Sequence, residues 1–463
     1  MLIWAGGPYH QPVSTSPTRA QDREILRLAV PAFLALVAEP LFLLADAAVV
    51  GHLGTRELAG LGIAGAVLQT VVGLCVFLAY GTTASVARLL GAGNRRAALA
   101  QGIDGIWLAV LIGSVATVLG MLLTRPLVSL FGASPGVTDN AATYLRLAFL
   151  GTVPLLVMLA ATGVLRGLQD TRTPLYVAVG GNALNVVLNV VLVHGIGSFA
   201  GIGLAGSAIG SVIAQVACAV ALVVVVVRGA RREGASLRPH PAGIRLAARA
   251  AVALVIRTLT LRAALLVTTY AVTAGAAPGD DAVPVATHQL AMTLWTFLAF
   301  VLDAIAIAAQ ALTGRHLGAG DVASTRAVTR RMVRWGIWSG VVTGVLLAAA
   351  GPFLGPLFTP DRAVHEALVP VLLVAALAQP VAGVVFVLDG VLIGAGDGAY
   401  LARAGTVVLL AYAPVVLVLA ALGSALTWIW AAFGAVFMGA RLVVLLHRAR
   451  GDAWLVTGSA AVR

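Results

Sequence analysis

Lysine is absent from this 463-residue chain, and charged residues of any kind make up only 10% of it. A GxxxxGK[ST] phosphate-binding loop requires its lysine, so the chain cannot hydrolyse ATP through such a loop. A soluble protein carries charge at about a quarter of its positions. With 60% hydrophobic residues and a mean hydropathy of +1.00, the chain is expected to lie in a membrane.

Cysteine and catalytic signatures are also scarce. The two cysteines, Cys75 and Cys218, lie within apolar runs, so neither a disulfide framework nor a metal cluster is expected. No HExxH sequence occurs. We therefore expect no enzymatic activity, no cofactor and no resident metal. If the chain transports a compound against its concentration gradient, the energy would then come from a gradient of H⁺ or Na⁺.

Apolar runs recur along the whole chain, and most are long enough at 1.5 Å per residue to cross a hydrocarbon core of about 30 Å. The sequence predicts an all-α integral membrane protein with twelve transmembrane helices. The expected spans are 26–50, 58–80, 103–124, 141–164, 174–195, 203–227, 250–274, 284–312, 332–351, 366–393, 401–422 and 425–446.

Arginine supplies every basic side chain apart from histidine, and its distribution predicts the orientation, since positive residues accumulate on cytoplasmic loops. With the N-terminus inside, only Arg56, Arg125 and Arg362 fall on outer loops. Both termini are therefore expected in the cytoplasm, and the absence of lysine with the richness in Ala, Arg, Gly and Val suggests a bacterial genome. Arg257 and Arg262 lie in the first half of the seventh span and are expected to snorkel to the cytoplasmic interface. The net charge of +12 then reflects topology and contact with anionic membrane lipids, not nucleic-acid binding.

An internal repeat divides the chain into two halves. The shift that takes Arg88–Asn94 (RLLGAGN) onto Arg315–Asp321 (RHLGAGD) also takes Val164–Asp170 onto Val391–Asp397. Two six-span copies point the same way, so an axis along the membrane normal should relate them. The expected parts are a tail (1–25), an N-lobe (26–227), a cytoplasmic interlobe loop (228–249), a C-lobe (250–446) and a second tail (447–463).

Polar residues inside the N-lobe spans are candidates for function, because charge at the bilayer centre is costly. Glu39 and Asp46 lie seven residues apart on one face of the first span, on either side of Pro40, and are interpreted as a proton or cation site. One face of the fifth span carries three amides that could complete this site or simply join helices. These amides are Asn182, Asn185 and Asn189. A similar face on the sixth span, with Ser207, Ser211 and Gln215, is attributed to packing.

The C-lobe spans contain acids as well. Asp303 has apolar neighbours for a full turn on either side, so it should face a cavity or a partner. Asp389 could line the same cavity or brace the turn at 394–397. His288, Gln289 and Gln310 in the eighth span could border the cavity or form structural hydrogen bonds.

Five segments together resemble the multidrug and toxic compound extrusion (MATE) transporters, and within them the DinF-like branch. The resemblance covers roughly residues 21–447. The segments are Glu39–Asp46 (EPLFLLAD), Val50–Gly54 (VGHLG), Leu165–Thr171 (LRGLQDT), Ala286–Ala291 (ATHQLA) and Leu388–Asp397 (LDGVLIGAGD).

The resemblance implies two lobes around a V-shaped cavity, alternating access, and export of amphipathic, often cationic compounds in exchange for H⁺ or Na⁺. It places the coupling carboxylate at Asp46. Asn185 matches the first position of the family's Asn-x-x-x-Asp pattern, whereas Asn189 replaces its acid. Either Glu39 contributes in its place or Asp46 acts with neutral partners, and Na⁺ would be held by Asp46, Asn185 and Asn189.

Two other functions fit a polytopic protein without an ATPase. A lipid-linked precursor flippase of the related superfamily would need more arginine inside its cavity to meet pyrophosphate, and the scarcity of such arginine favours a neutral or cationic substrate. A membrane-embedded enzyme would need a catalytic constellation, whereas only dispersed acids and amides occur. The sequence leaves the substrate and the coupling ion open, and a monomer is expected.

Overall fold

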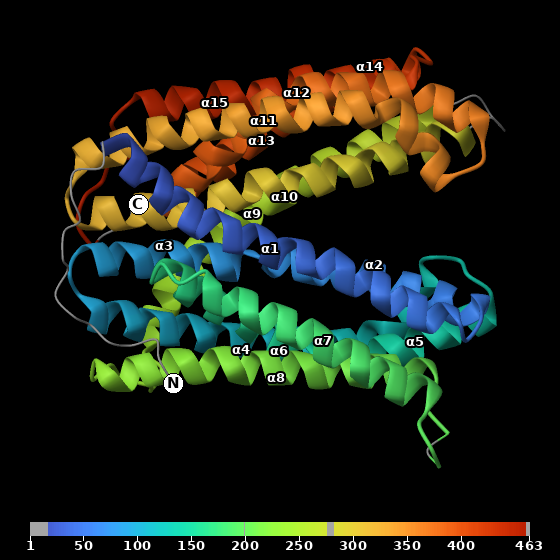
Figure 1. Ribbon diagram of the computed structural model, residues 1–463, viewed down its shortest axis with the longest axis horizontal. Helices are drawn as coiled ribbons and strands as arrows, with labels where there is room; N and C mark the ends of the chain where they lie inside the picture. The colour runs from blue at the N-terminus through green and yellow to red at the C-terminus, as the bar shows by residue number, and fades with distance from the viewer. Residues whose placement is uncertain (1–16, 199, 276–281, 460–463) are drawn as a thin grey trace.

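The computed structural model describes residues 17–198, 200–275 and 282–459, except the side chains of Pro17, Thr18, Glu39, Phe42 and Leu44. The first lobe is built from eight helical segments. These are α1 (Pro17–Gly51), α2 (Thr55–Cys75), α3 (Phe77–Gly91), α4 (Arg95–Ser129), α5 (Pro135–Phe149), α6 (Thr152–Gly167), α7 (Arg172–His194) and α8 (Leu204–Arg232). In Figure 1 they run from blue to green and form the lower layer of the molecule, except that the first part of α1 reaches the upper layer.

The second lobe forms the upper layer of Figure 1, from yellow to red. Its helices are α9 (Pro241–Gly275), α10 (Ala282–Gly318), α11 (Val322–Phe358), α12 (Arg362–Gly394), α13 (Gly398–Ala421), α14 (Leu426–Ala432) and α15 (Gly439–Arg450). A π-helical segment, Phe433–Met438, joins α14 to α15 within the last span.

Among the described residues, ten helices are long and apolar enough to cross a membrane, with α2 and α3 counted together as one. The pair α5 and α6, bent by 50° at Leu150–Gly151, supplies an eleventh span. Helix α1, of 35 residues, lies outside this count. The predicted all-α membrane fold in two lobes is therefore confirmed.

The four repeated turns predicted from the sequence share one backbone design. In each, the helix ends in a Schellman motif, a pair of backbone hydrogen bonds around a residue with positive φ. Glycine holds that position three times, at Gly93, Gly320 and Gly396, where it fits without strain. The fourth turn has Gln169 with φ 65°, and its side chain accepts a hydrogen bond from Arg315 of the other lobe.

The lobes touch where α3 and α10 end, at the arginine-rich end of the bundle. Gly91 packs on the carbonyl oxygen of Arg315, and Gly318 packs on that of Arg88, so the two copies of the repeat meet reciprocally. Arg88 also donates hydrogen bonds to the carbonyl oxygens of Ala395 and Val456 in the second lobe, at 3.2 and 2.8 Å. The chain thus closes this end with backbone contacts that only glycine permits.

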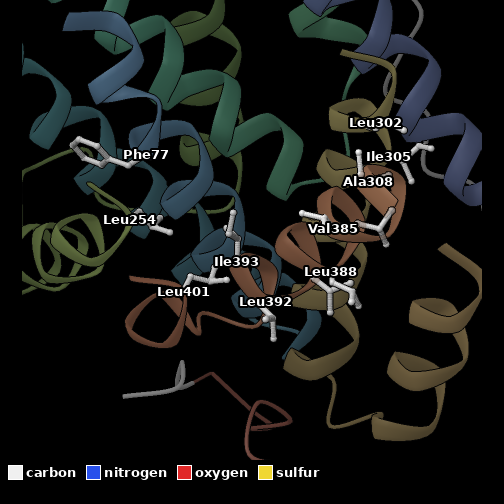
Figure 2. Close-up of a cluster of buried hydrophobic side chains, with 14 of the residues drawn as sticks. Phe77, Leu254, Leu302, Ile305, Ala308, Val385, Leu388, Leu392, Ile393 and Leu401 are labelled. Carbon is white, nitrogen blue, oxygen red and sulfur yellow. The ribbon is translucent and has the colours of Figure 1, made fainter. Parts of the chain in front are cut away.

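Buried apolar side chains form a core that continues across both lobes. Figure 2 shows part of it, with Phe77 of α3 and Leu254 of α9 on one side, and Leu302 of α10 and Leu388 of α12 on the other. Because α3 belongs to the first lobe and the other three helices to the second, the core holds the lobes together.

Candidate functional site

The carboxylate of Asp46 lies in the second half of α1 and is 4% exposed. Its Oδ1 accepts hydrogen bonds from Asn189 Nδ2 at 2.7 Å and Ser207 Oγ at 2.6 Å. Among the described residues, its Oδ2 has only the Tyr144 hydroxyl, at 3.5 Å. Within the described chain no arginine or histidine pairs with it, so the carboxylate is buried among neutral polar groups.

Local sequence explains why these groups converge. Asn185 and Asn189 are one helical turn apart on α7, and Asn189 Nδ2 is 2.9 Å from Asn185 Oδ1. Asn185 in turn donates to Ser211 Oγ of α8 at 3.0 Å. Gly210 lets α8 approach this closely, because a Cβ there would lie 2.4 Å from Asn189 Oδ1. That oxygen is buried and has no hydrogen-bond partner among the described residues.

The remaining residues predicted for this site lie elsewhere. Asn182 donates its amide to the carbonyl oxygen of Ala38, at 2.7 Å, and so binds the backbone of α1 rather than the carboxylate. The side chain of Glu39 lies outside the described residues.

Sequence reasoning missed two groups that contact Asp46. Ser207 was attributed to packing together with Ser211, although their spacing of one turn on α8 matches that of Asn185 and Asn189 on α7. Tyr144 of α5 carries no signal of its own in the sequence. Only the packing of α5 against α8 brings it to the carboxylate.

A second polar cluster lies inside the C-lobe, around Asp389 of α12. Arg257 of α9 pairs with both of its oxygens, with Nε 3.2 Å from Oδ1, and Arg441 of α15 lies 3.6 Å from Oδ2. Their side chains are only 10–12% exposed. The expectation that Arg257 snorkels to the interface is therefore wrong, because a buried acid holds it inside.

Asp389 does not brace the neighbouring turn either. That role falls to Asp397, which accepts a hydrogen bond from Arg448 Nε at 2.6 Å. Asp389 lies two turns before that turn, within α12, where its partners come from α9 and α15.

The carboxylate of Asp303 interacts with polar groups from both lobes. Its carboxylate interacts with Arg257 of its own lobe, and with Arg166 and the hydroxyl of Tyr80 from the first lobe. The carboxylates of Asp303 and Asp389 thus share Arg257. The expectation that Asp303 faces a partner agrees with this arrangement.

The three other C-lobe candidates do not join these acids through any described hydrogen bond. His288 is buried with its ring edge-on to Trp430, and its Nε2 lies 3.2 Å from the hydroxyl of Thr269. Gln289 is exposed, and Gln310 is buried where its backbone packs on Gly394. His288 and Gln310 therefore have packed surroundings rather than an open cavity.

A family model described as MatE matches residues 31–191 and 264–422, one segment in each lobe. The chain belongs to the MatE family. It is 31% identical over 405 residues to the Arabidopsis thaliana protein DETOXIFICATION 44, chloroplastic, with 83% of this chain and 74% of the relative covered. It is 29% identical over 414 residues to DNA damage-inducible protein F of Escherichia coli K12, with 89% and 88% covered.

The fold agrees with solved structures of MATE proteins. The Vibrio cholerae MATE transporter VcmN in its bent form superposes with a TM-score of 0.83 at 19% identity, over 95% of this chain and 99% of that one. The predicted resemblance to the MATE transporters is thus confirmed. The protein is a multi-pass membrane transporter of the multidrug and toxic compound efflux family, and not an enzyme.

Proposed function

We propose that this MatE protein is a secondary active antiporter that exports small amphipathic compounds by alternating access, in exchange for H⁺ bound at Asp46. The observation that carries the proposal is the burial of this carboxylate without a cationic partner in the described chain. Burying a lone ionised carboxylate costs several kcal/mol, so such a group gains a proton or a cation.

The groups around Asp46 favour a proton over Na⁺. Oδ1 is already occupied by two donors, whereas Oδ2 has one long contact and is free to carry a proton. Hard cations need several oxygen ligands. Among the described residues, Asn189 Oδ1 is the one unbonded amide oxygen beside the carboxylate.

Binding a proton at Asp46 would change how α1 is held. Hydrogen bonds to an ionised acceptor are about twice as strong as neutral ones, so protonation weakens the contacts from Asn189 and Ser207. Helix α1 packs on α7 in its own lobe and on α10 in the other. Pro31 and Pro40 each remove a backbone hydrogen bond within it. A local change at Asp46 can therefore alter the contact between the lobes.

We further infer that the protein lies as a monomer in a bacterial cytoplasmic membrane, with both termini in the cytoplasm. The arginine-rich loops support this orientation. In this orientation, the contacts of Gly91 with Arg315 and of Gly318 with Arg88 close the cytoplasmic side.

The test measures efflux of a fluorescent amphipathic compound from proteoliposomes under a pH gradient and, separately, under a Na⁺ gradient. We expect wild type to respond to the pH gradient, and Asp46→Asn to lose that response. The matched control is Asp139→Asn, which removes an exposed carboxylate paired with Arg125 and should leave transport unchanged. Full export by Asp46→Asn along the pH gradient would refute the coupling role, and export by wild type under the Na⁺ gradient alone would identify the other ion.

A further inference from the structure

Arg262 lies far from either end of α9. The predicted span 250–274 places it 12 residues from each end of the span, which at 1.5 Å per residue leaves about 18 Å on either side. These distances exceed the reach of an arginine side chain. The expectation that Arg262 snorkels to the interface therefore does not fit its position.

The guanidinium of Arg262 lies between the two lobes. Its Nη2 is so close to Gly73 of α2 that a Cβ on that glycine would lie 2.6 Å away. Helix α2 belongs to the N-lobe and α9 to the C-lobe. The side chain is nevertheless exposed, and no acid of the described chain forms a salt bridge with it.

An exposed, unpaired arginine at this depth needs water or a ligand, because charge in contact with lipid tails is costly. Three and four residues away, on the same helix faces, Leu259 and Leu266 of α9 and Gln69 and Thr70 of α2 are exposed. A single positive charge thus lies beside both apolar and neutral polar side chains.

The acids within the C-lobe spans leave little for a cationic ligand. Asp389 is paired with Arg257 and Arg441, and Asp303 interacts with Arg257 and Arg166. These two aspartates already have three arginines, and Arg262 adds a further positive charge between the lobes. The excess is positive, contrary to the expectation drawn from the scarcity of intramembrane arginine.

We propose that the exported compound is an amphipathic anion and that Arg262 binds its headgroup. The inference rests on the antiport proposed above and narrows its substrate class. A carboxylate, sulfonate or phosphate ester can accept two parallel hydrogen bonds from a guanidinium, a geometry that lysine cannot supply. Leu259 and Leu266, exposed on the same face of α9, would contact the hydrophobic body.

The test uses two probes with the same dansyl-alkyl skeleton, one ending in a sulfonate and the other in a trimethylammonium group. Both are offered to proteoliposomes under the coupling gradient, with wild type, Arg262→Gln and Arg262→Lys. Arg362→Gln, which removes an exposed arginine outside the spans, is the control. Monodispersity in detergent verifies the fold of each variant.

We expect wild type to export the sulfonate, and Arg262→Gln to raise its KM about tenfold or more with little change in kcat. Arg262→Lys should recover part of the loss. Arg362→Gln should behave as wild type. Export of the ammonium probe alone, or an unchanged KM for the sulfonate in Arg262→Gln, would overturn the inference while leaving antiport intact.

If folded protein exports neither probe under either gradient, both the antiport proposal and this inference are refuted. A fluorescent anionic phospholipid in the same vesicles separates the two sources of such a headgroup. Its Arg262-dependent translocation would identify a lipid as the cargo, as in the flippase alternative. Sulfonate export without lipid movement would identify a free amphipath.

Discussion

The reciprocal contacts of Gly91 with Arg315 and of Gly318 with Arg88 lead to a prediction about alternating access. A methyl group at Gly91 would lie 1.9 Å from the carbonyl oxygen of Arg315, whereas ordinary contact begins at 3.4 Å. The obstructing atom is backbone and cannot rotate away, so α3 and α10 must separate by about 1.5 Å. Overpacking of this kind costs about 1–3 kcal/mol.

That cost applies only to the conformation in which the arginine-rich ends touch. Gly91→Ala should therefore shift the equilibrium toward the conformation open at this end by roughly 5- to 150-fold. Gly318→Ala should act alike, because its Cβ would lie 2.0 Å from the carbonyl oxygen of Arg88.

The shift can be measured as a distance between spin labels at Arg96 and Ala323, exposed positions related by the repeat. Cys75 and Cys218 are first replaced by serine. The matched control is Gly65→Ala, since a Cβ there meets nothing within 4 Å. We expect longer distances to gain population in Gly91→Ala and not in Gly65→Ala. An unchanged distance distribution and unchanged transport in Gly91→Ala would refute the idea that this contact limits opening.

Three further predictions concern single contacts. Gly210→Ala should push Asn189 away from its carboxylate, since the new Cβ would lie 2.4 Å from Asn189 Oδ1, and gradient-driven efflux should fall; normal efflux would contradict this. Arg257→Gln should destabilise the protein by up to about 3–5 kcal/mol, seen as a lower Tm in detergent, because Asp389 loses its main partner. Trp454→Ala should cost about 3–5 kcal/mol, since that side chain is 1% exposed; an unchanged Tm would show that the C-terminal segment is not part of the core.

Periodicity and composition were sufficient for the helices and for their division into two lobes. The signals are local: long apolar runs define spans, and the GAGN and GAGD segments end helices through Gly93 and Gly320. The same repeat alignment could not show that its two copies pack on each other. That contact depends on how the lobes are placed, which no local pattern encodes.

The polar sites were only partly predictable, because a partner is chosen by tertiary packing. Asp46 stood out as a charge in an apolar helix, yet its donor Ser207 is 161 residues away. Arg257 appeared able to snorkel until Asp389, 132 residues away, was placed beside it. Sequence alone gives the presence of a buried charge. The function of that charge depends on whether an oppositely charged group or a neutral group packs against it in the folded protein.

The repeat also shows which features the two lobes share and which they do not. Its shift takes Gly91 onto Gly318, so the glycines that close the arginine-rich end are duplicated. It takes Asp46 onto Thr273, however, and Arg262 has only Ala35 as its counterpart. A buried acid without a cation therefore occurs in the first lobe, while the described acids at the centre of the second are neutralised by arginine. A symmetric scaffold with these unequal charges supports a division of labour in which one lobe exchanges the proton and the other meets an anionic cargo.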